Sequence, residues 1–363
     1  MQREEIRRAP VEQVLFWVSL RQIPLLMVSV CFFAISTASV HAQNGVNAVL
    51  VPIKVNDFAR SHLARLAPDG KFAYYVGFDT VLRVWDVEKN KEVTSIDFKD
   101  DKTKTGGRLR NVSVERAGNR AIVAISNGQY HLLDLPSGKK TTIKGHTAQG
   151  SKGLISPDGR FAILSGGDRS LLADEVKPTL KYWDLEKKRL TTTFIGHESF
   201  VYDMALSPDG KTLVTVGGHV SDRPIDCAVR VWDVTTKKET KKLSGHTATI
   251  SCVALTRDSS KIVTGSHDRT VRLWDVKRNS EVLKIDTGGS VWSLALSLDE
   301  KVCLVACKNI LSAFSLETGQ QLTEFREHRG IITSVGVFPD GRTAFSTCAA
   351  DDTFQIWTIP QVK

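Results

Sequence analysis

From about residue 46 onward, the chain alternates between short apolar runs and short polar turns. In the clearest stretch, apolar runs at 250–255, 261–265, 271–276 and 281–285 are separated by turns of Asp, Ser, Asn, Arg and His. The runs are rich in Val, Ile and Leu, which favour β-strands, and the turn residues interrupt them. This pattern predicts a unit of four short strands.

The same unit recurs along the chain, and a large apolar side chain marks its third strand. The intervals between these markers are 48, 50, 49, 42, 40 and 43 residues. A unit this short cannot bury its own apolar face and must stack against its neighbours. The seven marker positions are Trp85, Leu133, Trp183, Trp232, Trp274, Phe314 and Trp357.

Short motifs recur in register with these markers. Four units begin with Gly-His or Glu-His, and most end with Trp-Asp. A Pro-Asp-Gly turn, suited to a tight reversal, follows the first strand at residues 68–70, 157–159, 208–210 and 339–341. These motifs resemble the WD-repeat family of β-propellers. The resemblance implies an all-β, seven-bladed propeller of four-stranded antiparallel blades around a central channel.

The seventh unit has no fourth strand, because the chain ends soon after Trp357. Residues 47–55 (NAVLVPIKV) read as a strand that precedes the first unit. We therefore predict that this N-terminal strand pairs with the last blade and closes the ring, which removes an open sheet edge.

Residues 1–42 differ from the rest of the chain. Four arginines precede an uncharged apolar stretch at 23–35, and small residues lead to Ala42. This order is typical of a secretory signal. We expect residues 1–42 to be that signal and 43–363 to be the propeller, exported to the periplasm, cell envelope or extracellular space. The alternative is a membrane anchor retained at residues 23–40.

Five cysteines follow residue 42, namely Cys227, Cys252, Cys303, Cys307 and Cys348. An odd number leaves at least one unpaired, and most lie within expected strands, so we interpret them as small buried apolar residues. Neither a haem motif nor zinc-ligand spacing is present, and we expect no cofactor and no metal. The net charge of +9 indicates affinity for anionic surfaces, but predicted export makes nucleic acid an unsuitable partner.

A Ser or Thr, a His and an Asp recur together and superficially suggest a hydrolase. The resemblance instead implies that these residues form a buried hydrogen-bond network with the marker Trp, so no catalytic residue is expected. In the third unit, His146, Ser165 and Trp183 match, and the Asp is either Asp168 or Asp174. The complete sets are His197, Thr215, Asp226 and Trp232; His246, Thr264, Asp268 and Trp274; and His328, Thr347, Asp351 and Trp357.

Function is expected in the loops, since the blades are scaffold. Three long loops, at 99–110, 168–179 and 218–226, should share one face with two aromatic residues near the channel mouth. We predict a non-enzymatic scaffold that binds a protein partner on this face. The alternatives are a metal-dependent lactonase or hydrolase at the channel mouth and a binder of envelope glycan. The candidate contact residues are Tyr202, Trp292, Arg169, Asp174, Glu175, Lys177, Asp222 and Arg223.

Overall fold

The computed structural model describes residues 51–53, 63–67, 69–76, 79–89, 91–99, 108–169, 176–220, 224–348, 350 and 353–362. All of them belong to one compact unit, residues 41–363. The predicted signal or anchor at residues 1–42 lies outside the described residues. Among the described residues, no helix is long and apolar enough to cross a membrane.

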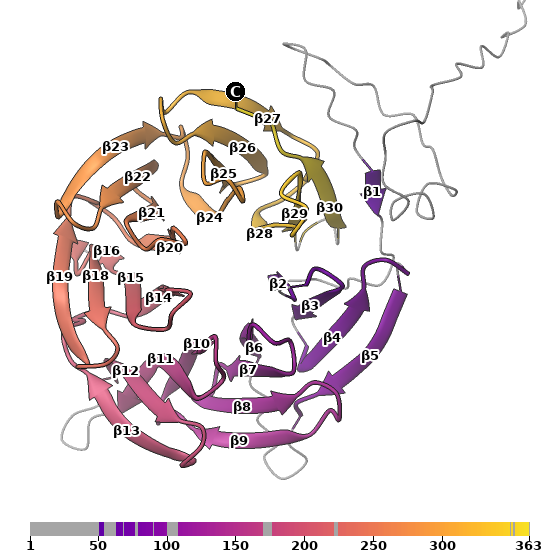
Figure 1. The fold of residues 1–363 in the computed structure, drawn as a ribbon, viewed down its shortest axis with the longest axis vertical. Coiled ribbons are helices and arrows are strands. Elements are labelled where there is room, and N and C mark those ends of the chain that lie inside the picture. The colour runs from indigo at the N-terminus through magenta and orange to yellow at the C-terminus, as the bar shows by residue number, and fades with distance from the viewer. Residues whose placement is uncertain are drawn as a thin grey trace, which may run out of the picture. The chain divides into compact units, whose positions relative to one another are not determined.

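The unit is a seven-bladed β-propeller of four-stranded antiparallel blades, as predicted (Figure 1). Each blade runs from an innermost first strand to an outermost fourth strand. Blade 1 contains β2 (Leu63–Leu66), β3 (Phe72–Val76), β4 (Val81–Asp86) and β5 (Lys91–Asp97). Blade 2 contains β6 (Leu109–Val114), β7 (Arg120–Ile125), β8 (Gln129–Asp134) and β9 (Lys140–Lys144). Blade 3 contains β10 (Gln149–Ile155), β11 (Phe161–Arg169), β12 (Val176–Asp184) and β13 (Arg189–Phe194).

The remaining blades follow the same order around the ring. Blade 4 contains β14 (Val201–Leu206), β15 (Thr212–Gly217), β18 (Ala228–Asp233) and β19 (Lys238–Ser244). Blade 5 contains β20 (Ile250–Leu255), β21 (Lys261–Ser266), β22 (Thr270–Asp275) and β23 (Ser280–Asp286). Blade 6 contains β24 (Val291–Leu296), β25 (Val302–Cys307), β26 (Ile310–Ser315) and β27 (Gln321–Phe325). Blade 7 contains β28 (Ile332–Val337), β29 (Thr343–Cys348), β30 (Thr353–Thr358) and the N-terminal β1 (Val51–Ile53).

The ring closes through the N-terminal strand. β1 pairs antiparallel with β30, with Val51 opposite Ile356 and Ile53 opposite Phe354. The prediction that the N-terminal strand completes the last blade is confirmed. Residues 47–50 and 54–55 of the expected strand lie outside the described residues.

Two of the three expected long loops contain ordered strand instead. β11 and β12 continue pairing out to Arg169 opposite Val176, so the insertion in blade 3 is an extended hairpin. In blade 4, β16 (His219–Val220) and β17 (Pro224–Ile225) form a small two-stranded sheet of their own. Backbone pairing satisfies peptide groups that a loop would leave to solvent, which is why long insertions fold this way.

The apolar core lies between neighbouring blades. One cluster joins Val84 of blade 1 to Val112 and Val123 of blade 2, and another joins Val229 of blade 4 to Trp274 of blade 5. Each blade therefore buries its faces against its neighbours, as the repeat length requires.

The first-to-second-strand turns share one backbone geometry. At the third position of the Pro-Asp-Gly turns, Gly159 and Gly210 have φ of +69° and +72°. In blade 5 the same position is Ser259, with φ of +60°. A residue with a Cβ atom is strained in this left-handed region, and glycine is not.

Replacing Ser259 with glycine is therefore expected to raise the free energy of unfolding by roughly 0.5–1 kcal/mol, since relief of backbone strain outweighs the added freedom of the unfolded chain. Urea denaturation measures the change. Ser260→Gly, one residue later and outside the left-handed region, is the matched control and should be neutral or destabilising. Equal effects of the two substitutions would contradict the explanation.

Candidate functional site

The His, Thr, Trp and Asp residues of blade 5 meet in one buried network. His246 donates from Nδ1 to Asp268 Oδ2 at 2.7 Å, and its Nε2 lies 2.8 Å from Thr264 Oγ1. Trp274 Nε1 donates to the same Thr264 oxygen at 2.9 Å. Because Thr264 accepts from the indole, its own proton is free for the imidazole, which fixes the tautomer of His246.

Burial makes this network an unsuitable site for catalysis. The side chains of His246 and Asp268 are 0% and 4% exposed, and Thr264 is fully buried. Burial lowers the pKa of His246, opposed by its hydrogen bond to Asp268. Burial alone would raise the pKa of Asp268, but hydrogen bonds from His246 and Thr270 hold it well below its usual range. A nucleophile needs access to substrate, and Thr264 has none.

Blade 4 contains an equivalent network. His197 Nδ1 donates to Asp226 Oδ2 at 2.7 Å, and His197 Nε2 and Trp232 Nε1 lie 2.7 and 2.8 Å from Thr215 Oγ1. Asp226 also accepts from the guanidinium of Arg230 at 2.7 Å. The structure thus brings all four predicted residues of this blade together.

In blade 7 the predicted Thr347 is wrong, because Ser346 occupies the network. His328 Nε2 and Trp357 Nε1 each lie 2.7 Å from Ser346 Oγ, whereas Thr347 contacts Thr333 across the strand pair. Successive side chains of a strand point to opposite faces, so a one-residue shift selects the wrong face. In blade 4 the hydroxyl residue Thr215 lies six positions after the turn residue Asp209. In blade 7, the residue six positions after the turn residue Asp340 is Ser346. Asp351 lies outside the described residues.

Blade 3 departs from the expected network. His146 Nε2 donates to the carbonyl of Thr179 at 3.2 Å, and Nδ1 lies 3.3 Å from the Tyr130 hydroxyl. Ser165, the expected partner, hydrogen-bonds the backbone of Lys152 instead. Burial, with a smaller contribution from the Lys181 cation, lowers the pKa of His146 to about 4.

Asp168 occupies the acidic position of blade 3. It accepts the Thr147 backbone N–H at 2.8 Å, as Asp268 accepts that of Thr247 in blade 5. Lys181 forms an ion pair with Asp168 at 2.7 Å. Asp168 is one of the two candidates that the sequence left open, and the other, Asp174, lies outside the described residues.

These acidic residues also define one face of the propeller, which we call the loop face. It consists of the connections between second and third strands and the connections from one blade to the next. Asp226 in the first kind of connection accepts the backbone N–H of Glu198 in the second kind at 3.0 Å. Asp168 and Thr147 are joined in the same way. The two kinds of connection therefore lie together, as predicted.

A β-bulge recurs near the start of the innermost strand in blades 2 to 7. At the same position each time, the innermost strand carries one extra residue that has no partner in the second strand, which turns its side chain out of the regular pleat. The strands begin directly after the blade-to-blade connections, so these side chains lie beside the loop face. They are Arg110, Ser151, Tyr202, Ser251, Trp292 and Thr333.

The predicted aromatic residues are exposed at two of these bulges. Tyr202 is 47% and Trp292 41% exposed. Trp292 packs on the ring of His267, in the β21–β22 turn of the neighbouring blade, with centroids 4.8 Å apart. Trp292 is thus held in place while one face stays available, which suits a contact residue.

Further apolar residues are exposed on the same face. Ile195 and Ile331, in blade-to-blade connections, are 88% and 46% exposed, and Ile225 of β17 is 40% exposed. Of the eight exposed large hydrophobic residues described, five lie on the loop face and three on outermost strands. The loop face therefore carries most of the exposed large hydrophobic residues in the described part of the chain.

The other predicted contact residues divide into two groups. Arg169 and Lys177 are exposed on the extended hairpin of blade 3. Four lie outside the described residues, namely Asp174, Glu175, Asp222 and Arg223.

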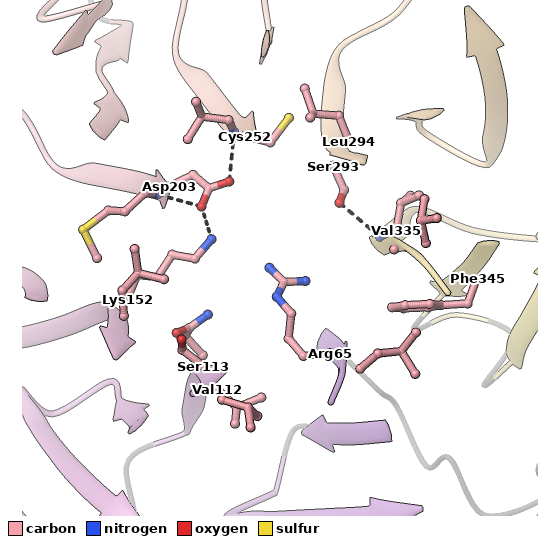
Figure 2. Close-up of a pocket in the computed structure, with 18 residues that line it drawn as sticks. Arg65, Val112, Ser113, Lys152, Asp203, Cys252, Ser293, Leu294, Val335 and Phe345 are labelled. Atoms are coloured by element: carbon pink, nitrogen blue, oxygen red, sulfur yellow. Dashed lines mark hydrogen bonds and ion pairs between the residues drawn. The ribbon is translucent and has the colours of Figure 1, made fainter. Parts of the chain in front are cut away.

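A polar cavity of about 350 Å³ at the centre of the ring escaped the sequence reasoning (Figure 2). Three charged side chains line it: Arg65 from β2, Lys152 from β10 and Asp203 from β14. Each is the third or fourth residue of the innermost strand of its blade. Comparing that one position across the seven units would have found the cluster.

Neighbouring blades are tied together around this cavity by side chains of their innermost strands. Asp203 accepts the backbone N–H of Val253 in the next blade at 3.0 Å. Likewise, Ser293 Oγ accepts the backbone N–H of Val335 in the next blade at 3.1 Å. The polar lining is therefore partly structural.

The described residues contain no group of three or more His, Cys, Asp or Glu side chains that could hold a metal ion. Cys252, Cys303, Cys307 and Cys348 are buried in strands, as predicted, and Cys227, just before β18, is buried as well. Burial raises the pKa of Cys307, which opposes formation of a reactive thiolate.

The seven four-stranded blades and the closing strand β1 form a β-propeller. Residues 188–233, 237–275 and 319–358 match the family described as WD domain, G-beta repeat. The chain therefore contains WD repeats, as the motifs predicted.

Several known proteins are similar to the chain. An Arabidopsis thaliana protein, "Cell division cycle 20.1, cofactor of APC complex", is 22% identical over 78% of this chain and 60% of its own length. The Caenorhabditis elegans "Transcription factor unc-37" is 26% identical over 54% of this chain and 31% of its own length. The Danio rerio "Guanine nucleotide-binding protein subunit beta-5b" is 31% identical over 60% of this chain and 53% of its own length. The chain spans less than two thirds of the length of each of these relatives.

Proposed function

We propose that the chain is an exported, non-enzymatic WD-repeat scaffold that binds a protein partner through its loop face. The observation that carries the proposal is the pair of aromatic residues, Tyr202 and Trp292, exposed at equivalent β-bulges. Large aromatic side chains held on a rigid scaffold supply much of the binding free energy in protein interfaces.

Two further observations support a binding role. Ile195, Ile225 and Ile331 add exposed apolar side chains to the same face, and exposed apolar surface of this kind is found at interaction sites. Relatives named as a cofactor of a complex and as a subunit of a guanine nucleotide-binding protein agree with this role. Export is supported by the signal-like order of residues 1–42 alone.

The non-enzymatic part of the proposal rests on the buried networks. Their Ser, Thr, His and Asp side chains satisfy one another and contribute to folding. The polar groups that resemble a hydrolase triad are thus already used in packing the blades.

The Tyr202→Ala/Trp292→Ala variant tests the loop face. Each residue is expected to contribute about 2 kcal/mol or more to binding, about thirtyfold in affinity, so the double variant should lose most of its capture. The measurement is capture from the cell-envelope fraction of the source organism by the immobilised propeller. Val282→Ala, at a similarly exposed residue of the outermost strand β23, is the control and should capture normally. Full capture by the double variant would show that the partner uses another surface.

A further inference from the structure

The charges at the centre of the ring do not balance. Arg65 and Lys152 both point into the cavity, and Asp203 is the single acidic residue among the described residues that line it (Figure 2). Lys152 forms an ion pair with Asp203, and both side chains are 12% exposed. One formal positive charge therefore remains in a confined space.

Asp203 cannot neutralise both Lys152 and Arg65. One carboxylate oxygen accepts from Lys152 and from the backbone N–H of Met204, and the other accepts from Val253 N at 3.0 Å. These bonds hold the carboxylate against the β10, β14 and β20 side of the ring, whereas Arg65 comes from β2.

Within the chain, the hydrogen-bond partners of Arg65 are uncharged groups, and both contact the same guanidinium nitrogen, Nη1. Nη1 donates to the Ala64 carbonyl at 3.1 Å and to Ser334 Oγ at 2.9 Å. Among the described residues no hydrogen bond engages Nε or Nη2, and the guanidinium points towards the open centre (Figure 2). A guanidinium presents its donors in a planar fork that matches carboxylate and phosphate oxygens.

Two like charges near one another in a confined space repel. Burial lowers the pKa of Arg65, and burial together with the nearby Arg65 lowers the pKa of Lys152. A bound anion would offset both the burial of the two cations and their mutual repulsion, because an opposite charge favours the charged forms of the two side chains.

We propose that the central cavity binds a small anion through its carboxylate or phosphate oxygens, held between Arg65 and Lys152. The volume of about 350 Å³ lies at the lower end of the range for small-molecule pockets, which suits a compact anion. Arg65 supplies the planar fork and Lys152 the point charge. The site is separate from the apolar contact residues of the loop face.

Isothermal titration of the propeller with inorganic phosphate, and separately with citrate, tests the proposal. We expect saturable binding that weakens as the salt concentration rises. Arg65→Gln should weaken it at least tenfold, because the fork and the charge are both lost. Asp203→Asn should tighten it several-fold, because the competing negative charge is removed.

The controls separate binding from folding. Arg326→Gln removes an exposed arginine beside the outermost strand β27 and should bind like the unchanged protein. If Arg65→Gln fails to fold, Lys152→Gln provides the second test, since glutamine can still hydrogen-bond Asp203. Absence of saturable binding of both anions, or binding that neither Arg65→Gln nor Lys152→Gln weakens, would overturn the proposal. Binding of a glutamate-rich peptide in place of both free anions would also overturn it, since the cavity would then serve an acidic partner segment.

Discussion

Replacing Asp268 with alanine is expected to lower the free energy of unfolding by about 3 kcal/mol, the typical effect of breaking a buried charged pair. The carboxylate of Asp268 accepts from His246, from the side chain of Thr270 at 2.6 Å and from the backbone N–H of Thr247. Arg272 lies 3.7 Å away and is itself 10% exposed. Alanine would leave these donors unsatisfied in the interior.

Urea denaturation of three variants separates this network from an ordinary surface effect. Asp275→Ala is the matched control, because Asp275 accepts the Arg278 backbone N–H in a surface turn and should cost about 1 kcal/mol or less. The His246→Ala/Asp268→Ala double variant should cost less than the sum of the single variants, since the two residues share one network. Strict additivity would show that His246 and Asp268 contribute independently.

The sequence was most informative where repetition reinforced a local pattern. Each of the seven marker positions lies in the third strand of its blade, because the packing between blades requires a large apolar side chain there. Trp232, Trp274 and Trp357 are almost fully buried, and their indole N–H groups explain why His and Thr or Ser recur beside them.

The predictions from the sequence were wrong where strand register or long-range contacts determine the structure. Ser346 and Thr347 are neighbours of nearly equal chemistry, and only the spacing from the turn residue Asp340 or the pairing of β29 with β30 selects between them. The insertion in blade 3 is too polar to show strand periodicity, so its sequence predicts a loop. The structure has an extended hairpin there.

No single unit of the sequence predicts the central cavity, and only a comparison of the same strand position across the units points to it. Arg65, Lys152 and Asp203 come from blades 1, 3 and 4, and their approach depends on the closure of the whole ring. A lone Arg or Lys within an apolar run reads as a solvent-facing strand residue.

Ring closure combines two contacts from opposite ends of the chain. On the outside of blade 7, β1 pairs with β30. On the inside, Arg65 and Ala64 of blade 1 hydrogen-bond Ser334 of β28. An apolar cluster that includes Tyr75 and Phe345 packs between the same two blades. The inner contact joins blades 1 and 7 directly, whereas β1 covers the outer edge of blade 7.

A chain that begins at residue 56 is expected to lose its cooperative thermal transition and to aggregate. Without β1, the outer edge of β30 presents unpaired N–H and C=O groups, which favour pairing with other chains. The matched control begins at residue 43 and keeps the closing strand, so it should remain soluble with an unchanged melting temperature. Light scattering and calorimetry measure the two properties.

A synthetic peptide of residues 43–60 provides the decisive addition to this experiment. If β1 acts by pairing, the peptide should restore solubility and the thermal transition when mixed with the chain that begins at residue 56, because it supplies the missing strand. A scrambled peptide of the same composition should not. A soluble truncated chain that melts at the temperature of the control would show that the inner contact through Arg65 and Ser334, with the apolar packing between blades 1 and 7, is sufficient to close the ring.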